Sequence, residues 1–244
     1  MSNLKYPDVS ILVPVHNEAG AVGALALEIA HAFAGDAFEI LFIDDASEDS
    51  TLAVLSAAQV TIPQLRLLRH AKNAGQSRAL RTGLLAARGG VIVTLDGDGQ
   101  NDPADAPDLV RALLAGPPDL GLVGGERVLR RDSLAKRLAS RLANAVRGRI
   151  LRDAAIDSGC GLKALRRDAA LRLPYFDHMH RYLPALMLRE GYQVGFRPVS
   201  HRPRLTGRSK YTNMGRLLAS VWDLLGVIWL RGRTRDTGGV EEIG

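Results

Sequence analysis

Cysteine is nearly absent from this chain of 244 residues, which has only Cys160. A single cysteine cannot form an intramolecular disulfide, and no cysteine and histidine spacing typical of a zinc site occurs. This usage indicates a reducing compartment. The N-terminal stretch MSNLKYPDVSILVP lacks the charged head and apolar core of a secretory leader, so we do not expect secretion.

Long hydrophobic runs and aromatic side chains are also scarce. The longest late apolar stretch, residues 217–230, is interrupted by Ser220, Asp223 and Gly226. It is shorter than the roughly 20 residues that a membrane-spanning helix needs. Aromatic residues make up 5% of the chain and form no visible base-stacking platform, so nucleic acid is not an expected partner. A formal net charge of +6 fits phosphate-bearing substrates or an acidic membrane surface.

Several familiar ligand-binding motifs are missing. The turn after the first apolar run reads PVHNEAG rather than G-x-G-x-x-G, which disfavours a dinucleotide cofactor. Neither a G-x-x-x-x-G-K-[ST] phosphate loop nor a G-x-S-x-G nucleophile turn occurs. The stretch DGDGQNDPADAP begins like an EF-hand loop, but Asn101 replaces the required glycine and Pro107 replaces the required glutamate. These absences exclude the commonest nucleotide, hydrolase and calcium sites.

What the chain does contain is a regular alternation of apolar runs and helical patterns through about residue 128. Runs of strand character occur at residues 9–15, 38–47, 64–70, 91–96 and 119–127. The alternation predicts an α/β fold with a Rossmann-like, mainly parallel sheet flanked by helices. Further along, residues 157–173 are predicted to form a glycine-containing turn and a helix, and residues 192–205 a short strand and a basic loop.

Polar side chains follow four of the expected strands, at the edge where ligands of such sheets bind. They are Asn17 and Glu18, Asp44 and Asp45, Asn73, and Asp96 and Asp98. Each alone is explained by a turn or a helix cap, but together they favour a site. Oxygen ligands from Asp96, Asp98 and Gln100 suit Mg²⁺ or Mn²⁺, which would neutralise charge developing on a departing diphosphate.

Six motifs then occur in the order seen in family 2 glycosyltransferases of the GT-A fold. They read VSILVPVHNE, EILFIDDASEDST, NAGQSRALRTGLLAARGGVIVTLDGDGQNDP, GGER, DSGCGLKALRRD and RLTGRSKY. DGDGQ and GRSKY resemble, more narrowly, the dolichol-phosphate mannose synthase and polyprenyl-phosphate glycosyltransferase branch. The resemblance implies transfer of a sugar from a nucleotide-diphosphate donor, GDP-mannose or a UDP-hexose, to a dolichyl or undecaprenyl phosphate.

The resemblance also implies roles for individual residues. The nucleotide sugar would contact Pro14, His16, Glu18, Asp45, Asn73, Gly75 and Asp96, with Asp45 bonded to the base. The metal would be held by Asp96, Asp98 and Gln100. The acceptor phosphate would contact Arg127, Arg137, Arg204, Ser209 and Lys210. Catalysis would depend on Asp98, Arg127, Arg204 and Lys210.

A phosphate acceptor suits this set of residues. A phosphate monoester has a second pKa near ~6 and is largely dianionic at neutral pH, so it can attack the anomeric carbon without a general base. The enzyme then needs positioning and charge stabilisation, and in-line attack predicts inversion. An alternative is a GT-A transferase acting on a glycan or other hydroxyl, for which Asp157 would be the candidate base. A catalytically inactive binding module is a third possibility.

Residues 213–235 follow the expected catalytic domain of residues 1–212. Their apolar residues recur at helical spacing, with arginines on both sides. Such a helix suits the headgroup region of a membrane, and equally well packing against the core or another subunit. Many members of the branch continue into membrane-spanning helices. This chain does not, so we expect a peripheral enzyme on the cytoplasmic face of a membrane, in contact with the membrane surface or with an integral membrane partner subunit. We also expect a disordered tail at residues 236–244.

Overall fold

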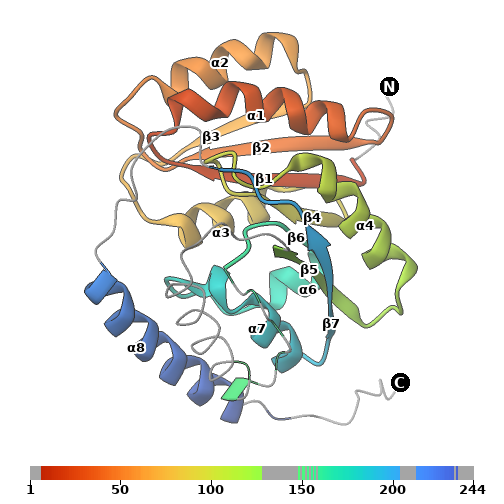
Figure 1. Cartoon of the computed structure of the whole chain (residues 1–244), viewed down its shortest axis with the longest axis vertical. Helices are drawn as coiled ribbons and strands as arrows, with labels where there is room; N and C mark the ends of the chain where they lie inside the picture. Colours follow the sequence, from red (N-terminus) through yellow and green to blue (C-terminus); the bar gives the residue numbers. More distant parts are fainter. Residues whose placement is uncertain are drawn as a thin grey trace, which may run out of the picture.

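A computed structural model describes residues 7–127, 148, 150, 151, 153, 155, 157, 159–203, 213–233 and 235, without the side chains of 213–220. The first half alternates strands and helices (Figure 1). Its elements are β1 (Val9–Val15), α1 (Ala19–Ala32), β2 (Phe38–Asp44), α2 (Thr51–Thr61), β3 (Leu65–Arg69), α3 (Gln76–Ala86), β4 (Val91–Thr94), η1 (Pro103–Asp105), α4 (Ala106–Ala115) and β5 (Leu120–Arg127). The second half contains β6 (Lys163–Arg166), α6 (Arg167–Arg172), η2 (Met179–Arg181), α7 (Leu183–Arg189), β7 (Gln193–Val199) and α8 (Asn213–Gly232).

The described residues form a seven-stranded sheet in the order β3-β2-β1-β4-β6-β5-β7. Parallel pairs join β1 to β2 and β4, β2 to β3, and β5 to β7. The predicted α/β fold with a mainly parallel sheet is therefore confirmed. Because the chain turns outward from β1 to β3 and then returns to β4, the carboxyl ends of β1 and β4 flank a topological switch point, where such sheets bind ligands.

One strand corrects the prediction for residues 157–173. This segment was expected to form a turn and a helix, but Lys163–Arg166 forms β6, antiparallel to both β4 and β5. Its sequence, KALR, consists of good helix formers without a β-branched residue, so local propensity favours a helix. The central position overrides that propensity, because both neighbours pair with its backbone and Ala164 and Leu165 are buried.

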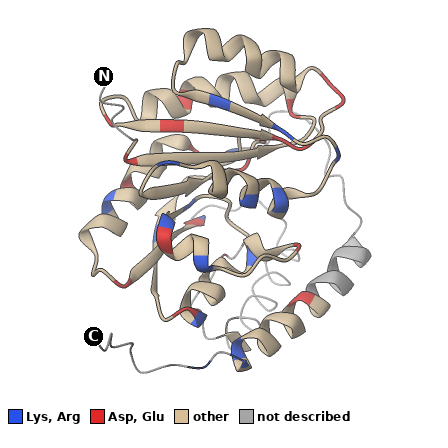
Figure 2. Cartoon of the chain, turned by 180° about the vertical axis from the view of Figure 1, so that it is seen from behind, with Lys and Arg blue, Asp and Glu red and all other residues tan. Residues whose placement is uncertain are grey.

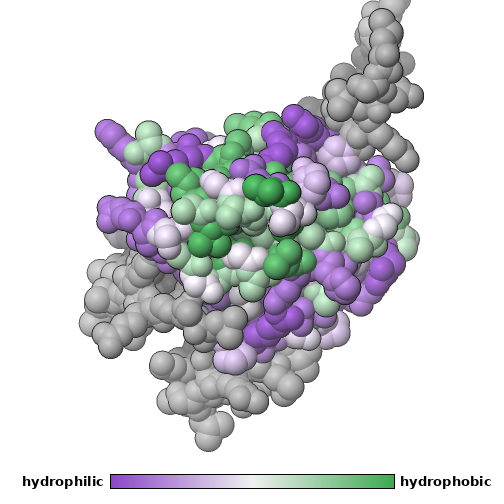
Figure 3. Space-filling model, turned by 90° about the horizontal axis from the view of Figure 1, so that it is seen from above, coloured by the Kyte–Doolittle hydropathy of each residue, from purple (hydrophilic) through white to green (hydrophobic). Residues whose placement is uncertain are grey.

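The core lies in two layers, one on each face of the sheet. Alternate residues of β1 point to opposite layers, so Ile11 and Val13 join the layer beneath α1, α2 and α4, while Leu12 joins the layer beneath α3, α6 and α7. Burial on both faces explains why the strand reads as a continuous apolar run. On the outer side of α1 and α2, hydrophobic and near-neutral side chains occupy the centre and hydrophilic ones the margins (Figure 3).

Helix α8 lies against the α7 side of the molecule with one face. Val227 is fully buried, and Leu224 packs on the same core layer. The Nδ1 atom of His178 lies 2.9 Å from Oδ2 of Asp223. The outward face carries Trp222, which is 73% exposed, and Trp229, which is 62% exposed.

Charged residues are sparse along the strands and along the described turns of α8, apart from Asp223 and the basic end of that helix (Figure 2). No helix in the described part of the chain is long and apolar enough to cross a bilayer. The tail at residues 236–244, predicted to be disordered, lies outside the described residues.

Candidate functional site

Asp45, directly after β2, joins the loops at the carboxyl edge of the sheet. Its Oδ1 atom accepts hydrogen bonds from the backbone N–H of Ala74 at 2.9 Å, and Oδ2 accepts one from Gly75 at 2.8 Å. Nδ1 of His70 lies 2.7 Å from the same Oδ1. These bonds fix the loop that leads into α3, where Gly75 has a φ of 86°, a conformation that favours glycine. Within the described residues Oδ2 accepts this one hydrogen bond, and a carboxylate oxygen has two lone pairs.

The other residues predicted to contact the nucleotide lie around this centre. Nδ1 of His16 is 2.9 Å from the carbonyl oxygen of Asp45, and Nδ2 of Asn73 donates to the same oxygen at 3.3 Å. The backbone N–H of Glu18 donates to Oγ1 of Thr51 at 2.8 Å, which ties the end of β1 to α2. The structure thus brings His16, Asp45, Asn73 and Gly75 into one cluster.

The end of β1 also meets the DGDG loop. A Cβ atom added at Gly97 would collide with Val15 and with the carbonyl oxygen of Pro14. Glycine at this position lets the loop lie directly on β1. Pro14 is thereby placed beside the loop that carries Asp96 and Asp98, on the same edge as the Asp45 cluster.

Asp96 is held from two sides. Its Oδ1 atom accepts a hydrogen bond from Nε2 of Gln76 at 2.8 Å, and its backbone N–H donates to Oδ1 of Asn101 at 3.3 Å. On the opposite side, a Cβ atom at Gly161 would collide with the Asp96 carboxylate. Burial raises the pKa of Asp96, and the negative charge of Asp98 raises it further, while Lys163 and Arg127 oppose the shift.

The donor atoms of this loop fit a divalent cation. Asp96 and Asp98 supply carboxylate oxygens, Gln100 supplies an amide oxygen, and a cation would relieve the repulsion between the two carboxylates. Across the described ranges, no three His, Cys, Asp or Glu side chains converge as a metal site. A cation held here would keep open positions for water or phosphate oxygens, which is typical of Mg²⁺.

Arg127, at the end of β5, is paired with Asp157. Its Nε donates to Oδ2 of Asp157 at 2.5 Å and its Nη2 to Oδ1 at 2.7 Å. The side chains are 16% and 8% exposed. Burial disfavours the charge of Arg127, but the hydrogen bonds and charge of Asp157 outweigh it and raise the Arg127 pKa. The pair is bidentate and uses two of the five guanidinium N–H groups.

Three further residues at this edge were missed by the sequence analysis. Gln76 bonds Asp96, Lys163 lies on the unexpected strand β6, and Nδ1 of His180 is 2.8 Å from Oγ of the buried Ser77. Burial lowers the pKa of His180 to about 3. One feature of the sequence could have indicated Gln76, namely its place at the start of a helix that faces this edge. Lys163 had no such feature, because the pattern of KALR predicts a helix rather than a strand.

Four predicted residues have no described placement. Arg137, Arg204, Ser209 and Lys210 lie outside the described residues. Of the acceptor set, the structure therefore places Arg127 alone.

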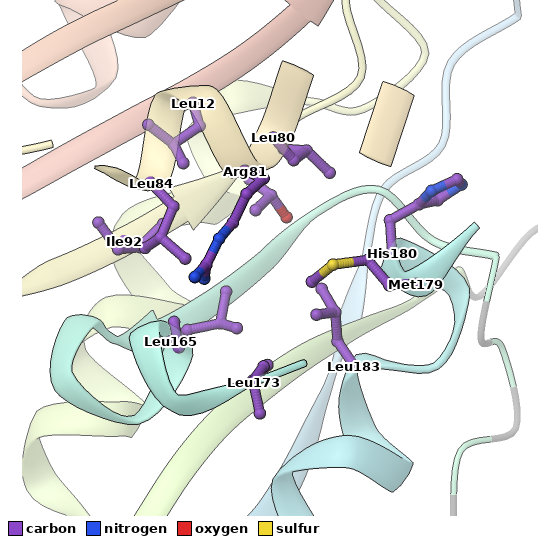
Figure 4. A pocket seen from close by; sticks show the side chains of 12 residues that line it. Leu12, Leu80, Arg81, Leu84, Ile92, Leu165, Leu173, Met179, His180 and Leu183 are labelled. Carbon is purple, nitrogen blue, oxygen red and sulfur yellow. The ribbon is translucent and has the colours of Figure 1, made fainter. Parts of the chain in front are cut away.

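A small apolar cavity of about 30 Å³ lies behind the edge, between the sheet and the helices of the α3 side (Figure 4). Its lining includes Leu12, Leu84, Leu165 and Leu173. The side chain of Arg81 extends toward Leu165, and the ring of His180 points away from the leucines (Figure 4). A cavity this small and apolar does not fit a nucleotide sugar, so the polar edge is the candidate site.

Comparison with known proteins identifies the family of this chain. The glycosyl transferase family 2 model matches residues 10–173. Dodecaprenyl-phosphate galacturonate synthase of Rhizobium johnstonii is 34% identical over 91% of this chain and 67% of its own length. Undecaprenyl-phosphate 4-deoxy-4-formamido-L-arabinose transferase of Sodalis glossinidius is 33% identical over 91% of this chain and 68% of its own.

Solved structures give the same fold. Glucosyl-3-phosphoglycerate synthase from Mycobacterium tuberculosis, in complex with Mn²⁺, UDP-glucose and glycerol 3-phosphate, matches with a TM-score of 0.69 at 19% identity. The match covers 95% of this chain and 82% of that one. The predicted GT-A fold is confirmed. The chain belongs to glycosyl transferase family 2, as its motifs indicated.

Proposed function

We propose that this chain transfers a sugar from a nucleotide-diphosphate donor to a polyprenyl phosphate, with inversion at the anomeric carbon. The two curated relatives, which span nine tenths of the chain, are both named for polyprenyl-phosphate acceptors. The observation within the site that carries the proposal is the bidentate pair of Arg127 with Asp157. Both oxygens of the candidate base are bonded to a cation, which suits an acceptor that needs no base.

The donor would lie across the Asp45 cluster and the DGDG loop. In this proposal Asp45 bonds the base through the remaining lone pair of Oδ2, and Pro14, His16, Glu18, Asn73 and Gly75 surround the nucleotide. Asp96, Asp98 and Gln100 would hold Mg²⁺ or Mn²⁺ beside the diphosphate. The cation supplies charge neutralisation on the departing diphosphate. The structural relative with bound Mn²⁺ and UDP-glucose supports this assignment.

The acceptor phosphate would bind on the Arg127 side of the edge. Arg127 keeps three guanidinium N–H groups beyond the Asp157 pair, and these suit phosphate oxygens. We assign Arg137, Arg204, Ser209 and Lys210 to the same phosphate. Asp98, Arg127, Arg204 and Lys210 would then stabilise charge along the reaction path.

The lipid substrate requires access to a membrane. We assign that contact to residues 213–235, because the outward face of α8 carries two exposed tryptophans and its end carries Arg233 and Arg235. Tryptophan and arginine together suit an anionic headgroup region. An integral membrane partner subunit is the other partner we propose, at the cytoplasmic face. Nucleic acid is not a proposed partner.

The acceptor class is tested by the variant Asp157→Asn. For a phosphate acceptor, transfer to polyprenyl phosphate should stay within about tenfold of the wild type, because no base is removed. A hydroxyl acceptor would lose the contribution of a general base, roughly 10²–10⁴-fold. The measurement is kcat with labelled nucleotide sugar and undecaprenyl phosphate in detergent. A loss of a thousandfold with intact folding would favour the transferase that acts on hydroxyl groups.

A further inference from the structure

Lys163 is a buried cation at the edge of the sheet that the proposed function does not use. Only 4% of the residue is exposed, and it lies opposite Thr94 of β4 and Gly124 of β5. Its Nζ donates to the carbonyl oxygen of Cys160. Within the described residues this is the only hydrogen bond of an ammonium group that has three N–H donors. Two donors therefore remain in a site shielded from water.

The anions nearest to Lys163 already have other partners. Oδ1 of Asp96 accepts from Gln76, and both oxygens of Asp157 accept from Arg127. Burial is the largest effect on Lys163 and lowers its pKa, to which Arg127 adds, although Cys160, Asp96 and Asp157 favour the charged form. Lysine is seldom buried without a close anionic partner. In the described residues no carboxylate lies within ion-pair distance of this ammonium.

The position of Lys163 is between the two halves of the site. Asp96 belongs to the donor side, and the Arg127–Asp157 pair belongs to the acceptor side. The turn between these halves carries glycine at positions 159 and 161, where a Cβ atom would approach Arg127 and collide with Asp96 respectively. Backbone therefore lines this junction, and the buried ammonium of Lys163 is bonded to the Cys160 carbonyl of the same turn.

We propose that Lys163 binds an anionic oxygen of the substrate at the junction of donor and acceptor. This rests on the proposed function. The anion is an oxygen of the acceptor phosphate or a carboxylate on the transferred sugar. Both present the same chemistry to an ammonium group, which donates a charge-assisted hydrogen bond.

The test compares Lys163→Met, which removes the charge at similar length, with Lys163→Arg and with the control Arg88→Met. Arg88 is exposed and lies before β4, at the opposite edge of the sheet. Calorimetry would measure the Kd of farnesyl phosphate, UDP, UDP-glucose and UDP-glucuronate for each protein. A charge-assisted hydrogen bond contributes roughly 1.5–3 kcal/mol, so losing it should raise the relevant Kd about 10–100-fold while UDP binding stays unchanged.

The choice of ligands distinguishes an acceptor phosphate from a sugar carboxylate as the anion that Lys163 binds. A raised Kd for farnesyl phosphate assigns Lys163 to the acceptor phosphate, and a raised Kd for UDP-glucuronate but not UDP-glucose assigns it to a sugar carboxylate. Lys163→Arg should retain part of the affinity, because arginine also donates charged hydrogen bonds. A purely structural role for Lys163 would not produce this difference between the two variants. If every Kd of Lys163→Met stays within twofold of the wild type, the proposal is wrong.

Two further results of these experiments can be interpreted, a variant that does not fold and a wild type that transfers no sugar. If Lys163→Met fails to fold, Lys163→Gln gives the same comparison, because its amide still donates to the Cys160 carbonyl. If the wild type transfers no sugar from any donor, the proposed function fails while the binding measurements still decide the role of Lys163. If the wild type transfers sugar and the Lys163 variants bind normally, the proposal for Lys163 alone fails.

Discussion

Gly161 shows how a single residue shapes the proposed donor side of the site, through its contact with Asp96. Oγ1 of Thr94 donates to the carbonyl oxygen of Gly161 at 2.6 Å, which fixes the backbone of that residue against β4. The position where a Cβ would stand is filled by the Asp96 carboxylate. Any other residue at position 161 must displace either the strand or the carboxylate.

The variant Gly161→Ala should therefore weaken donor binding at least tenfold and cost about 1–3 kcal/mol of unfolding free energy, as overpacking does. Titration calorimetry with UDP and Mn²⁺ measures the first effect, and urea unfolding measures the second. Gly90→Ala is the matched control, because a Cβ there meets nothing within 4 Å. Equal UDP affinity in the two variants would contradict the packing of Gly161 on Asp96.

His180 links stability to pH. Its pKa of about 3, lowered first by burial and further by Arg181, Lys163 and His178, lies below the ordinary value of 6.5. In the unfolded chain the imidazole of His180 is therefore protonated below about pH 6.5, whereas in the native state it is protonated only below about pH 3. Stability is lost as pH falls through this window, at up to about 1.4 kcal/mol per pH unit.

Replacing the histidine with a side chain that does not titrate should remove this loss. Between pH 6.5 and 5, the unfolding free energy of His180→Gln should rise relative to wild type by about 2 kcal/mol. Urea unfolding at the two pH values measures it. His31→Gln, at an exposed position, should show no such change. An unchanged difference for His180→Gln would mean that His180 has the same pKa in the native and the unfolded state.

Sequence reasoning predicted some residues of the candidate site and missed others for a physical reason. Asp45, Asn73 and Asp96 end or follow apolar runs, and the parallel pattern of those runs puts their ends on one edge. Lys163 has no such marker, because its strand owes its existence to neighbours far away in the sequence. Gln76 was missed because its place at the start of a helix does not reveal its bond to Asp96, which joins the ends of two different elements.

At the scale of elements, the sequence pattern disagrees with the observed structure in β6 and agrees with it in α8. β6 has a helical pattern and forms a strand, since it fills the gap between β4 and β5. For α8 the apolar spacing agrees with the helix, and Val227 takes the buried face while Trp222 and Trp229 take the exposed one. Pattern alone left open whether the outward face contacts lipid or protein.

The outward face of α8 should bind anionic lipid. Replacing Trp222 and Trp229 with serine should lower partitioning to phosphatidylglycerol vesicles at least tenfold, because each ring contributes more than 1 kcal/mol on burial. Binding should also weaken with salt, since Arg233 and Arg235 attract the lipid phosphates. Vesicle sedimentation of the full chain measures both effects.

The control for this experiment changes exposed apolar residues elsewhere. Val60 on α2 is 84% exposed and Leu114 on α4 is 57% exposed. Their replacement with serine should leave vesicle binding unchanged. If the tryptophan variant sediments like the wild type, α8 does not supply the membrane contact.

At the scale of the whole molecule, the fold follows from the alternation of strand and helix patterns. The sheet order places the ends of β1, β2 and β4 side by side, with β6 and β5 completing the far half of the edge. One half carries the Asp45 cluster and the DGDG loop, and the other carries Arg127, Asp157 and Lys163. The proposed division into a donor half and an acceptor half was not visible in the sequence, because it depends on the antiparallel insertion of β6.

The most direct test of the account is transfer of labelled sugar to lipid. Wild-type protein is incubated with undecaprenyl phosphate, Mn²⁺ and a panel of labelled GDP- and UDP-sugars, and the lipid extract is analysed for product. At least one donor should give a lipid-linked sugar phosphate, and Asp98→Asn should reduce its formation by a hundredfold or more with folding intact. Absence of product from every donor, or full activity of Asp98→Asn, would contradict the account.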